Sequence, residues 1–233
     1  MTPSPSWQKP VAITVGTTAI VALLSRLPDS YSATAVGFGF LAVSYFLVLR
    51  TDDHEKIARY GLSFAGLFEP EPLSVPRIAR EGGQALRWAL GACLLFLPAF
   101  WLGFLWWWRI RVPFHAPPIS SLGSDLAGQL LVIALPEEAF YRGYLQSALD
   151  EVYEPRWRVL GAKLGPSLLL TSALFALGHL STEFNAGRLA VFFPSLVFGY
   201  LRARTGGIGA GLVFHALCNL FASYLGQSYG FPQ

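Results

Sequence analysis

Long apolar stretches recur along this chain, separated by short polar connections. Seven of them have the character of membrane-spanning helices, at roughly residues 11–28, 31–49, 86–108, 122–148, 166–181, 188–202 and 206–226. A helix needs about 20 apolar residues to cross the hydrocarbon of a bilayer. The pattern predicts an all-α fold, a polytopic transmembrane helical bundle of about seven spans. Eight is the other possible count, because the fifth and sixth stretches are short.

The composition agrees with a lipid environment. Of the 233 residues, 53% are hydrophobic and only 13% are charged, whereas soluble domains carry about 25% charged residues. We therefore expect an integral, multi-pass membrane protein in contact with the lipid bilayer, and no nucleic-acid partner. The first apolar stretch lacks a strongly basic start, and a second stretch follows almost at once. Both features favour a first transmembrane helix over a signal peptide.

The polar connections divide the chain into five regions. These are two N-terminal spans in residues 1–50, a charged loop in 51–85, a third span with an outer loop in 86–121, a helical bundle in 122–226 and a short tail in 227–233. The charged loop has the composition of a cytoplasmic segment, and an amphipathic surface helix within it is one option.

Lysine and arginine positions predict the orientation, because basic residues concentrate on the cytoplasmic side. A cytoplasmic N-terminus places thirteen of the seventeen basic residues in cytoplasmic segments and leaves Arg26, Arg109, Arg111 and Arg188 outside. The turn at 106–118 is then also outside. Fourteen arginines against three lysines suggest a GC-rich genome, and we expect the protein in a bacterial cytoplasmic membrane.

Two adjacent carboxylates, Glu137 and Glu138, interrupt the fourth apolar stretch. A carboxylate at the centre of a bilayer costs at least ~2.5–3.5 kcal/mol, so both need a partner or water. Arg142 lies four residues after Glu138, on the same helix face, where an ion pair can form. Glu137 points about 100° away and has no such partner in its own helix. We predict a structural role for Glu138 and a reactive one for Glu137. The alternative is a packing network without chemistry.

Other polar residues lie in the later apolar stretches. His179 has Phe175 one turn before it, and His215 has Asn219 one turn after it. A single buried histidine is more often a packed core residue than a catalyst. Three separate spans that each contribute a titratable residue to one cavity, however, indicate a functional site. Pro136 directly precedes the two glutamates and predicts a kink or an opening of their helix.

The order Glu-Glu-x-x-x-Arg, Phe-x-x-x-His and His-x-x-x-Asn on successive apolar stretches resembles the CAAX prenyl protease and bacteriocin-processing family. These intramembrane glutamic endopeptidases include the type II CAAX prenyl endopeptidase. The resemblance covers about residues 122–226, which would make this bundle the catalytic region, whereas residues 1–122 match no motif. Family members commonly have eight spans, one more than the seven counted here.

The resemblance implies a role for each matching residue. Glu137 would be the general base that activates water, His179 would hold that water or help to activate it, and His215 with Asn219 would form the oxyanion site. The remaining motif positions would have structural or supporting roles, namely Glu138, Arg142 and Phe175. No metal ligand and no cofactor are implied. The implied substrate is a membrane-associated or lipidated protein or peptide, such as a prenylated C-terminal tail, a peptide precursor or the membrane anchor of a surface protein.

Two other functions stay open at this point. Glu137, His179 and His215 form a set of two histidines and one carboxylate that could hold a catalytic zinc ion, although the compact His-Glu-x-x-His signature is absent. The chain could instead be a catalytically silent membrane immunity or partner-binding protein, because a fold alone does not establish activity. An unpaired Glu137 favours the enzyme, since a scaffold has no need of it.

The predicted topology also indicates how a substrate arrives. The helix that carries Glu137 would run inward from Ser124, so its carboxylate would lie about 20 Å along the helix, past the midplane of the bilayer. A substrate tail presented from the cytoplasmic side would then have the shorter path, although the cavity can open sideways to either leaflet.

Overall fold

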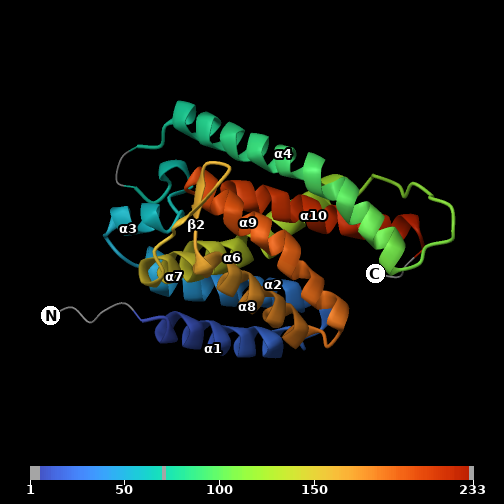
Figure 1. The fold of residues 1–233 in the computed structure, drawn as a ribbon, viewed down its shortest axis with the longest axis horizontal. Coiled ribbons are helices and arrows are strands. Elements are labelled where there is room, and N and C mark those ends of the chain that lie inside the picture. The colour runs from blue at the N-terminus through green and yellow to red at the C-terminus, as the bar shows by residue number, and fades with distance from the viewer. Residues whose placement is uncertain (1–5, 70–71, 231–233) are drawn as a thin grey trace.

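The computed structural model describes residues 6–69 and 72–230, and it has an elongated bundle of helices (Figure 1). The helices are α1 (Gln8–Leu24), α2 (Asp29–Ser44), α3 (His54–Arg59), α4 (Val75–Trp107), α5 (Leu122–Gly128), α6 (Leu135–Glu138), α7 (Ser147–Val152), α8 (Pro166–Thr182), α9 (Phe192–Thr205) and α10 (Gly209–Ser228). The predicted all-α fold is confirmed. Within the described residues the only sheet is the hairpin of β1 (Trp157–Val159) and β2 (Ala162–Leu164).

Each of the seven apolar stretches coincides with helix. Three helical segments of the described chain are long and apolar enough to cross a membrane, Asp29–Leu49, Val75–Trp107 and Gly209–Ser228, and α1 is a shorter apolar helix. Length and composition therefore support a membrane protein, while the count of seven spans stays a prediction. The predicted tail 227–233 begins inside α10, and its residues 231–233 lie outside the described part, as do residues 1–5 of the first region.

The helices pack side by side, and the connections between them lie at two opposite ends of the bundle. Helix α1 packs against α2 and α8, α8 against α9, α9 against α10, and α10 against α4. The short helix α3 and the β-hairpin lie at one end of the bundle, and the long connection between α4 and α5 lies at the other (Figure 1). This is the arrangement expected when consecutive spans alternate in direction.

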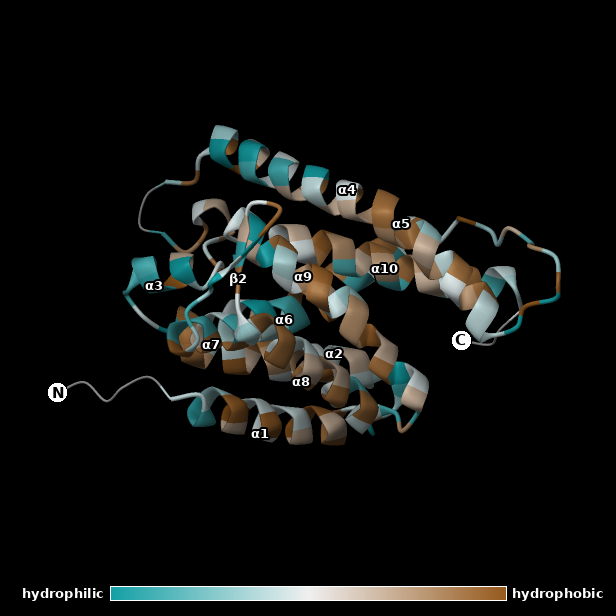
Figure 2. Cartoon of the chain, viewed as in Figure 1, coloured by the Kyte–Doolittle hydropathy of each residue, from teal (hydrophilic) through white to brown (hydrophobic). Residues whose placement is uncertain are grey.

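Helix α4 differs from the prediction for the charged segment. Residues 51–85 were expected as a loop, but α4 already begins at Val75 and has 33 residues. The proline at 76 explains the early start, because a helix tolerates proline in its first turn. Arg77 then contacts Glu69 and Glu81, and the hydrogen bonds from Arg77 hold the pKa of Glu69 below its ordinary value. The first turns of α4 are hydrophilic and its later turns hydrophobic (Figure 2).

Helical turns run without a break from α5 to α7, with a π-helical turn on each side of α6, at Gln129–Ala134 and Ala139–Gln146. Pro136 has no N–H to donate to the carbonyl of Val132. The helix is not broken there, and wider π-helical turns lie on both sides of α6 instead. A Cβ atom at Gly37 of α2 would lie 2.6 Å from the Val132 carbonyl oxygen, so only glycine fits there. Helix α2 therefore packs closely against the helix that carries the two glutamates.

The orientation of the bundle can be tested by labelling. In a variant without Cys93 and Cys218, single cysteines at positions 56, 113 and 160 should react with an impermeant maleimide in intact cells only at 113. The reason is that positions 56 and 160 lie in α3 and the β-hairpin, at the end predicted to be cytoplasmic. Labelling at 56 or 160 but not at 113 would reverse the orientation.

Candidate active site

An ion pair buried in the centre of the bundle joins Glu138 and Arg142. Arg142 Nη1 lies 3.0 Å from Glu138 Oε1, and both side chains are fully buried. On its other side, Arg142 Nη2 donates to Ser195 Oγ at 2.7 Å and to the Ser195 carbonyl at 3.3 Å. The guanidinium also stands over the rings of Phe175 and Phe198, at 4.5 and 4.9 Å from their centroids. Arg142 thereby ties three helices together.

His215 of α10 is fixed by the same carboxylate. Its Nδ1 donates to Glu138 Oε1 at 3.0 Å, and its ring stacks on Phe198 with 4.5 Å between centroids and 12° between planes. Because Nδ1 carries the hydrogen of this bond, the second nitrogen, Nε2, is the one left for chemistry. It lies 3.8 Å from Glu137 Oε2, beyond direct hydrogen-bond distance.

Glu137 has a different environment from its neighbour. Its side chain is 13% exposed, whereas that of Glu138 is fully buried. Glu137 Oε2 has no hydrogen-bond partner in the structure, although it is buried. A buried carboxylate oxygen without a donor is rare, because it costs roughly 1–3 kcal/mol or more. Glu138 Oε2 also lacks a hydrogen-bond partner. The two glutamates differ instead in their contacts, because Glu138 Oε1 lies 3.0 Å from both Arg142 and His215, whereas Glu137 has only His215 Nε2 at 3.8 Å.

His179 reaches the same space from the last turn of α8. Its Nδ1 lies 3.0 Å from the carbonyl oxygen of Phe175. A carbonyl only accepts, so Nδ1 must donate, and in the neutral ring Nε2 then carries a lone pair. The ring also packs on Phe175 with 4.4 Å between centroids. The one-turn spacing of Phe175 and His179 thus fixes both the position and the tautomer of the histidine.

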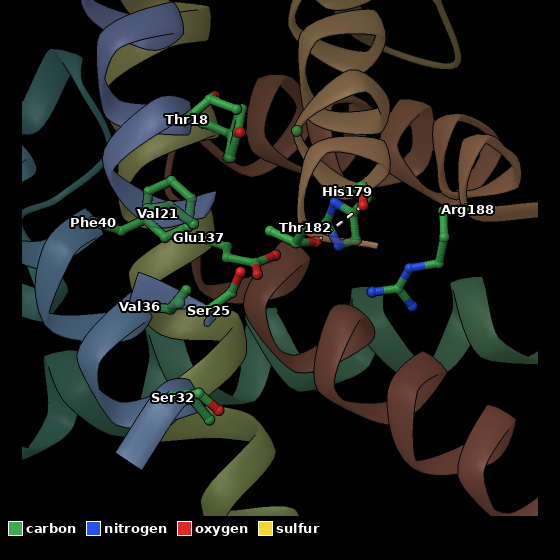
Figure 3. A pocket seen from close by; sticks show the side chains of 13 residues that line it. Thr18, Val21, Ser25, Ser32, Val36, Phe40, Glu137, His179, Thr182 and Arg188 are labelled. Carbon is green, nitrogen blue, oxygen red and sulfur yellow. Dashed lines mark hydrogen bonds between the residues drawn. The ribbon is translucent and has the colours of Figure 1, made fainter. Parts of the chain in front are cut away.

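A pocket of about 170 Å³ lies where Glu137 and His179 meet. Figure 3 shows the two side chains pointing into it from α6 and α8, with the Arg188 guanidinium on its far side. Most of the other lining residues come from α1, α2 and the turn between them, namely Thr18, Val21, Ser25, Ser32, Ala33, Val36 and Phe40. At ~30 Å³ for each water molecule, the pocket has room for about five or six of them.

Asn219 is not part of this pocket. It lies one turn after His215 on α10, but its Nδ2 donates to Gln129 Oε1 at 2.8 Å. One of its two amide hydrogens is therefore occupied, and the other is available to a ligand. His215 does not line the pocket either, although Nε2 lies near Glu137. The structure thus brings Glu137, His179 and His215 together and places Asn219 beside them.

Three residues of this network were not singled out in the sequence. Ser195 and Phe198 support Arg142 and His215, and Gln129 holds Asn219. Gln129 and Ser195 could have been selected from the sequence, since each is a polar residue within a predicted span. Phe198 could not, because aromatic residues are common in apolar helices. Its stacking on His215 is known only from the packing of α9 on α10.

No group of three or more His, Cys, Asp or Glu side chains in residues 6–69 and 72–230 is placed so that it could hold a metal ion. This bears on the zinc alternative, which requires Glu137, His179 and His215 to converge on one point. His179 approaches Glu137 through the pocket, whereas His215 points its Nδ1 at Glu138.

Part of the pocket lining lies near one end of the bundle. Ser25 and Ser32 lie on either side of the turn between α1 and α2, Thr182 is the last residue of α8, and Arg188 follows it. These residues belong to the end of the bundle that the basic residues predict to be outside. The reason is that α1 ends at Leu24 and α8 at Thr182, so the helices around Glu137 stop near it on that side.

Comparison with known proteins agrees with this site. Residues 120–221 match the family model described as "Type II CAAX prenyl endopeptidase Rce1-like". The match begins just before α5 and ends within α10, so it contains every residue of the Glu138–Arg142–His215 network as well as Glu137, His179 and Asn219. A search of curated proteins and a search of solved structures each gave no match. This segment of the chain is therefore similar to the Rce1-like family of type II CAAX prenyl endopeptidases.

Proposed function

We propose that this protein is a glutamate-dependent intramembrane endopeptidase in which Glu137 activates water. The family supplies the general part of this function, a membrane protease of the CAAX type. The specific part, activation of water by Glu137, is supported by the difference between the surroundings of the two carboxylates. Glu138 is paired with Arg142 and His215 at hydrogen-bond distance, whereas Glu137 has no hydrogen bond to its Oε2 and lines a pocket large enough for water.

The water would be held between two acceptors. Glu137 Oε2 and the lone pair of His179 Nε2 both require a donor, and a water molecule in the pocket supplies two O–H groups. The chemical step then follows. Glu137 takes a proton from the water, the oxygen forms a bond to the scissile carbonyl carbon, and the carbonyl electrons move to its oxygen. When the C–N bond breaks, Glu137 returns the proton to the leaving amine.

His215 and Asn219 would stabilise the oxyanion. For this, His215 must be an imidazolium, because its Nδ1 hydrogen is already donated to Glu138 and only a second proton makes Nε2 a donor. The imidazolium also balances the buried charges, since two carboxylates then face two cations, Arg142 and His215. Asn219 contributes the amide hydrogen that Gln129 leaves unused. A single oxyanion donor is typically worth roughly 2.7–4 kcal/mol of transition-state stabilisation.

The substrate would be a peptide segment at the membrane. The pocket lies within the bundle, and Ser25, Ser32 and Arg188 in its lining are at the end that the basic residues predict to be outside. With that orientation, a peptide precursor or the membrane anchor of a surface protein is favoured over a lipidated cytoplasmic tail. The reverse orientation would favour the lipidated tail.

One experiment separates the three functions considered. Purified protein would be incubated with solubilised membrane proteins from cells that lack it, with and without a metal chelator, and new peptide termini would be mapped by mass spectrometry. We expect the same new termini in both samples. Termini that disappear with the chelator and return with zinc would support the metalloprotease. If no new termini appear in either sample, the protein is catalytically silent.

A further inference from the structure

The β-hairpin has an apolar side chain at its tip that the fold does not explain. Its turn consists of Leu160 and Gly161, between the paired residues Val159 and Ala162. Both turn residues have left-handed backbone angles, with φ values of 45° and 82°. Such a turn favours Asn or Asp followed by Gly, and only position 161 meets this preference. The Leu160 side chain is 82% exposed, so packing within the protein does not account for a leucine there.

Two like charges face each other across the same hairpin. Arg158 and Lys163 are directly opposite in the antiparallel register, and both are exposed. Their neighbours Ala162 and Leu164 are buried against α9. Successive side chains of a strand point to opposite faces, so the two cations lie on the face away from the bundle. Like charges in this position destabilise a strand pair, and no described residue forms an ion pair with either one.

A third cation without a counter-ion adjoins the turn. A Cβ atom at Gly161 would lie 3.1 Å from Nε of Arg204, in the last turn of α9, so the guanidinium packs directly against the hairpin. The guanidinium also lies over the ring of Trp88 in α4, with 4.7 Å between Cζ and the ring centroid. Its Nε is buried and makes no hydrogen bond. Arg204 has no acidic partner among the described residues, so its N–H groups are available to an anion.

Trp88 indicates the depth of this cluster in the membrane. It lies at the start of the apolar stretch 86–108, after the hydrophilic first turns of α4 (Figure 2). Tryptophan is enriched at the boundary between the hydrocarbon and the headgroups of a bilayer. Arg204 contacts both this ring and the hairpin turn. The tip of the hairpin therefore lies near the headgroups.

We propose that the tip of the β-hairpin and Arg204 form a binding site for phospholipids with an anionic headgroup. Charge complementarity selects this occupant, because the three cations Arg158, Lys163 and Arg204 lack acidic partners and basic residues near a membrane attract anionic lipids. The exposed Leu160 side chain selects a lipid over a soluble anion, since it can lie among the acyl chains. None of these residues lines the pocket of Glu137, so the site does not depend on the proposed function.

The test compares two lipids that differ in headgroup charge. Purified protein in detergent would be titrated with dioctanoyl phosphatidylglycerol, which is anionic, and with dioctanoyl phosphatidylcholine, which has no net charge. Bound lipid would be counted by native mass spectrometry. We expect the anionic lipid to bind at least about tenfold more tightly. In Arg158→Gln with Lys163→Gln this ratio should fall to about threefold or less, through weaker binding of the anionic lipid.

The matched control removes two arginines at the same end of the bundle that already have acidic partners. Arg59 pairs with Asp53 and Glu55, and Arg156 pairs with Glu154. The variant Arg59→Gln with Arg156→Gln has the same change in net charge, and it should keep the preference for the anionic lipid.

The melting temperature without added lipid separates binding from a structural role. Arg158→Gln with Lys163→Gln removes a repulsion, so this variant should melt no lower than the wild type. A variant that loses both stability and the lipid preference would assign the pair a structural role and refute the proposal. The proposal is also wrong if the variant keeps the preference, if the control loses it equally, or if the wild type has none. Displacement of the anionic lipid by an equal concentration of inorganic phosphate would indicate a site for a soluble anion instead.

Discussion

Replacing Glu137 by glutamine should abolish cleavage and leave the protein folded. The amide is nearly the same size as the carboxylate but is a far weaker base. General-base catalysis contributes roughly 10²–10⁴-fold to a rate, so kcat should fall by at least 100-fold. The melting temperature should hardly change, because Glu137 Oε2 makes no hydrogen bond that the substitution could remove. Rates would be measured in detergent on a substrate identified from the mapped termini.

Glu138→Gln is the matched control for this experiment. It is the same change one residue further on, but it removes the negative charge that faces Arg142 and His215. We expect its main effect on stability, seen as a lower melting temperature. Cleavage by Glu137→Gln at a rate close to that of the wild type would refute the role of Glu137 as the base.

Arg142→Ala should have the largest effect on stability. Removal of one partner from a buried ion pair typically costs ~3–5 kcal/mol, because the other charge is left without compensation. Here the fully buried Glu138 carboxylate keeps only its contact with His215, and the bonds from Arg142 to Ser195 are lost as well. In a chain of this size each kcal/mol shifts the melting temperature by about 2–4 °C. We therefore expect a decrease of roughly 6–20 °C in detergent, with a low yield.

Two further variants test whether the uncompensated charge of Glu138 causes the loss of stability in Arg142→Ala. In Arg142→Ala with Glu138→Gln, the carboxylate is neutral, so part of the lost stability should return. Arg59→Ala removes an arginine whose pairs with Asp53 and Glu55 are exposed, and it should cost less than ~1 kcal/mol. A stable but inactive Arg142→Ala protein would contradict the structural role and place Arg142 in the chemistry.

Local spacing predicted much of the site. The four-residue separation of Glu138 and Arg142 indicated an ion pair, and the structure contains it. The same rule indicated that Glu137 has no partner in its own helix, and its Oε2 is without a hydrogen bond. Both relations depend only on the geometry of one helix, which is known from the sequence numbers alone.

Relations between helices were harder to predict. The family resemblance implied an oxyanion site of His215 and Asn219, but nothing in the sequence indicated that Asn219 would donate a hydrogen bond to Gln129, ninety positions away. The early start of α4 was missed because charged residues and prolines resemble a loop, although proline in the first turn of a helix is common. The lining of the pocket depends on how α1, α2 and α8 pack around Glu137, and no single segment of the sequence contains that information.

The walls of the pocket come from two separate parts of the chain. Seven of its thirteen lining residues lie in α1, α2 and the turn between them, outside the segment 120–221 that matches the family. The residues proposed for the reaction all lie inside that segment. Substitutions in the first 50 residues can therefore change which peptide fits without disturbing the machinery that cuts it. Substitutions of the residues in α1 and α2 that line the pocket should therefore change the preference among substrates while the proposed chemistry is kept.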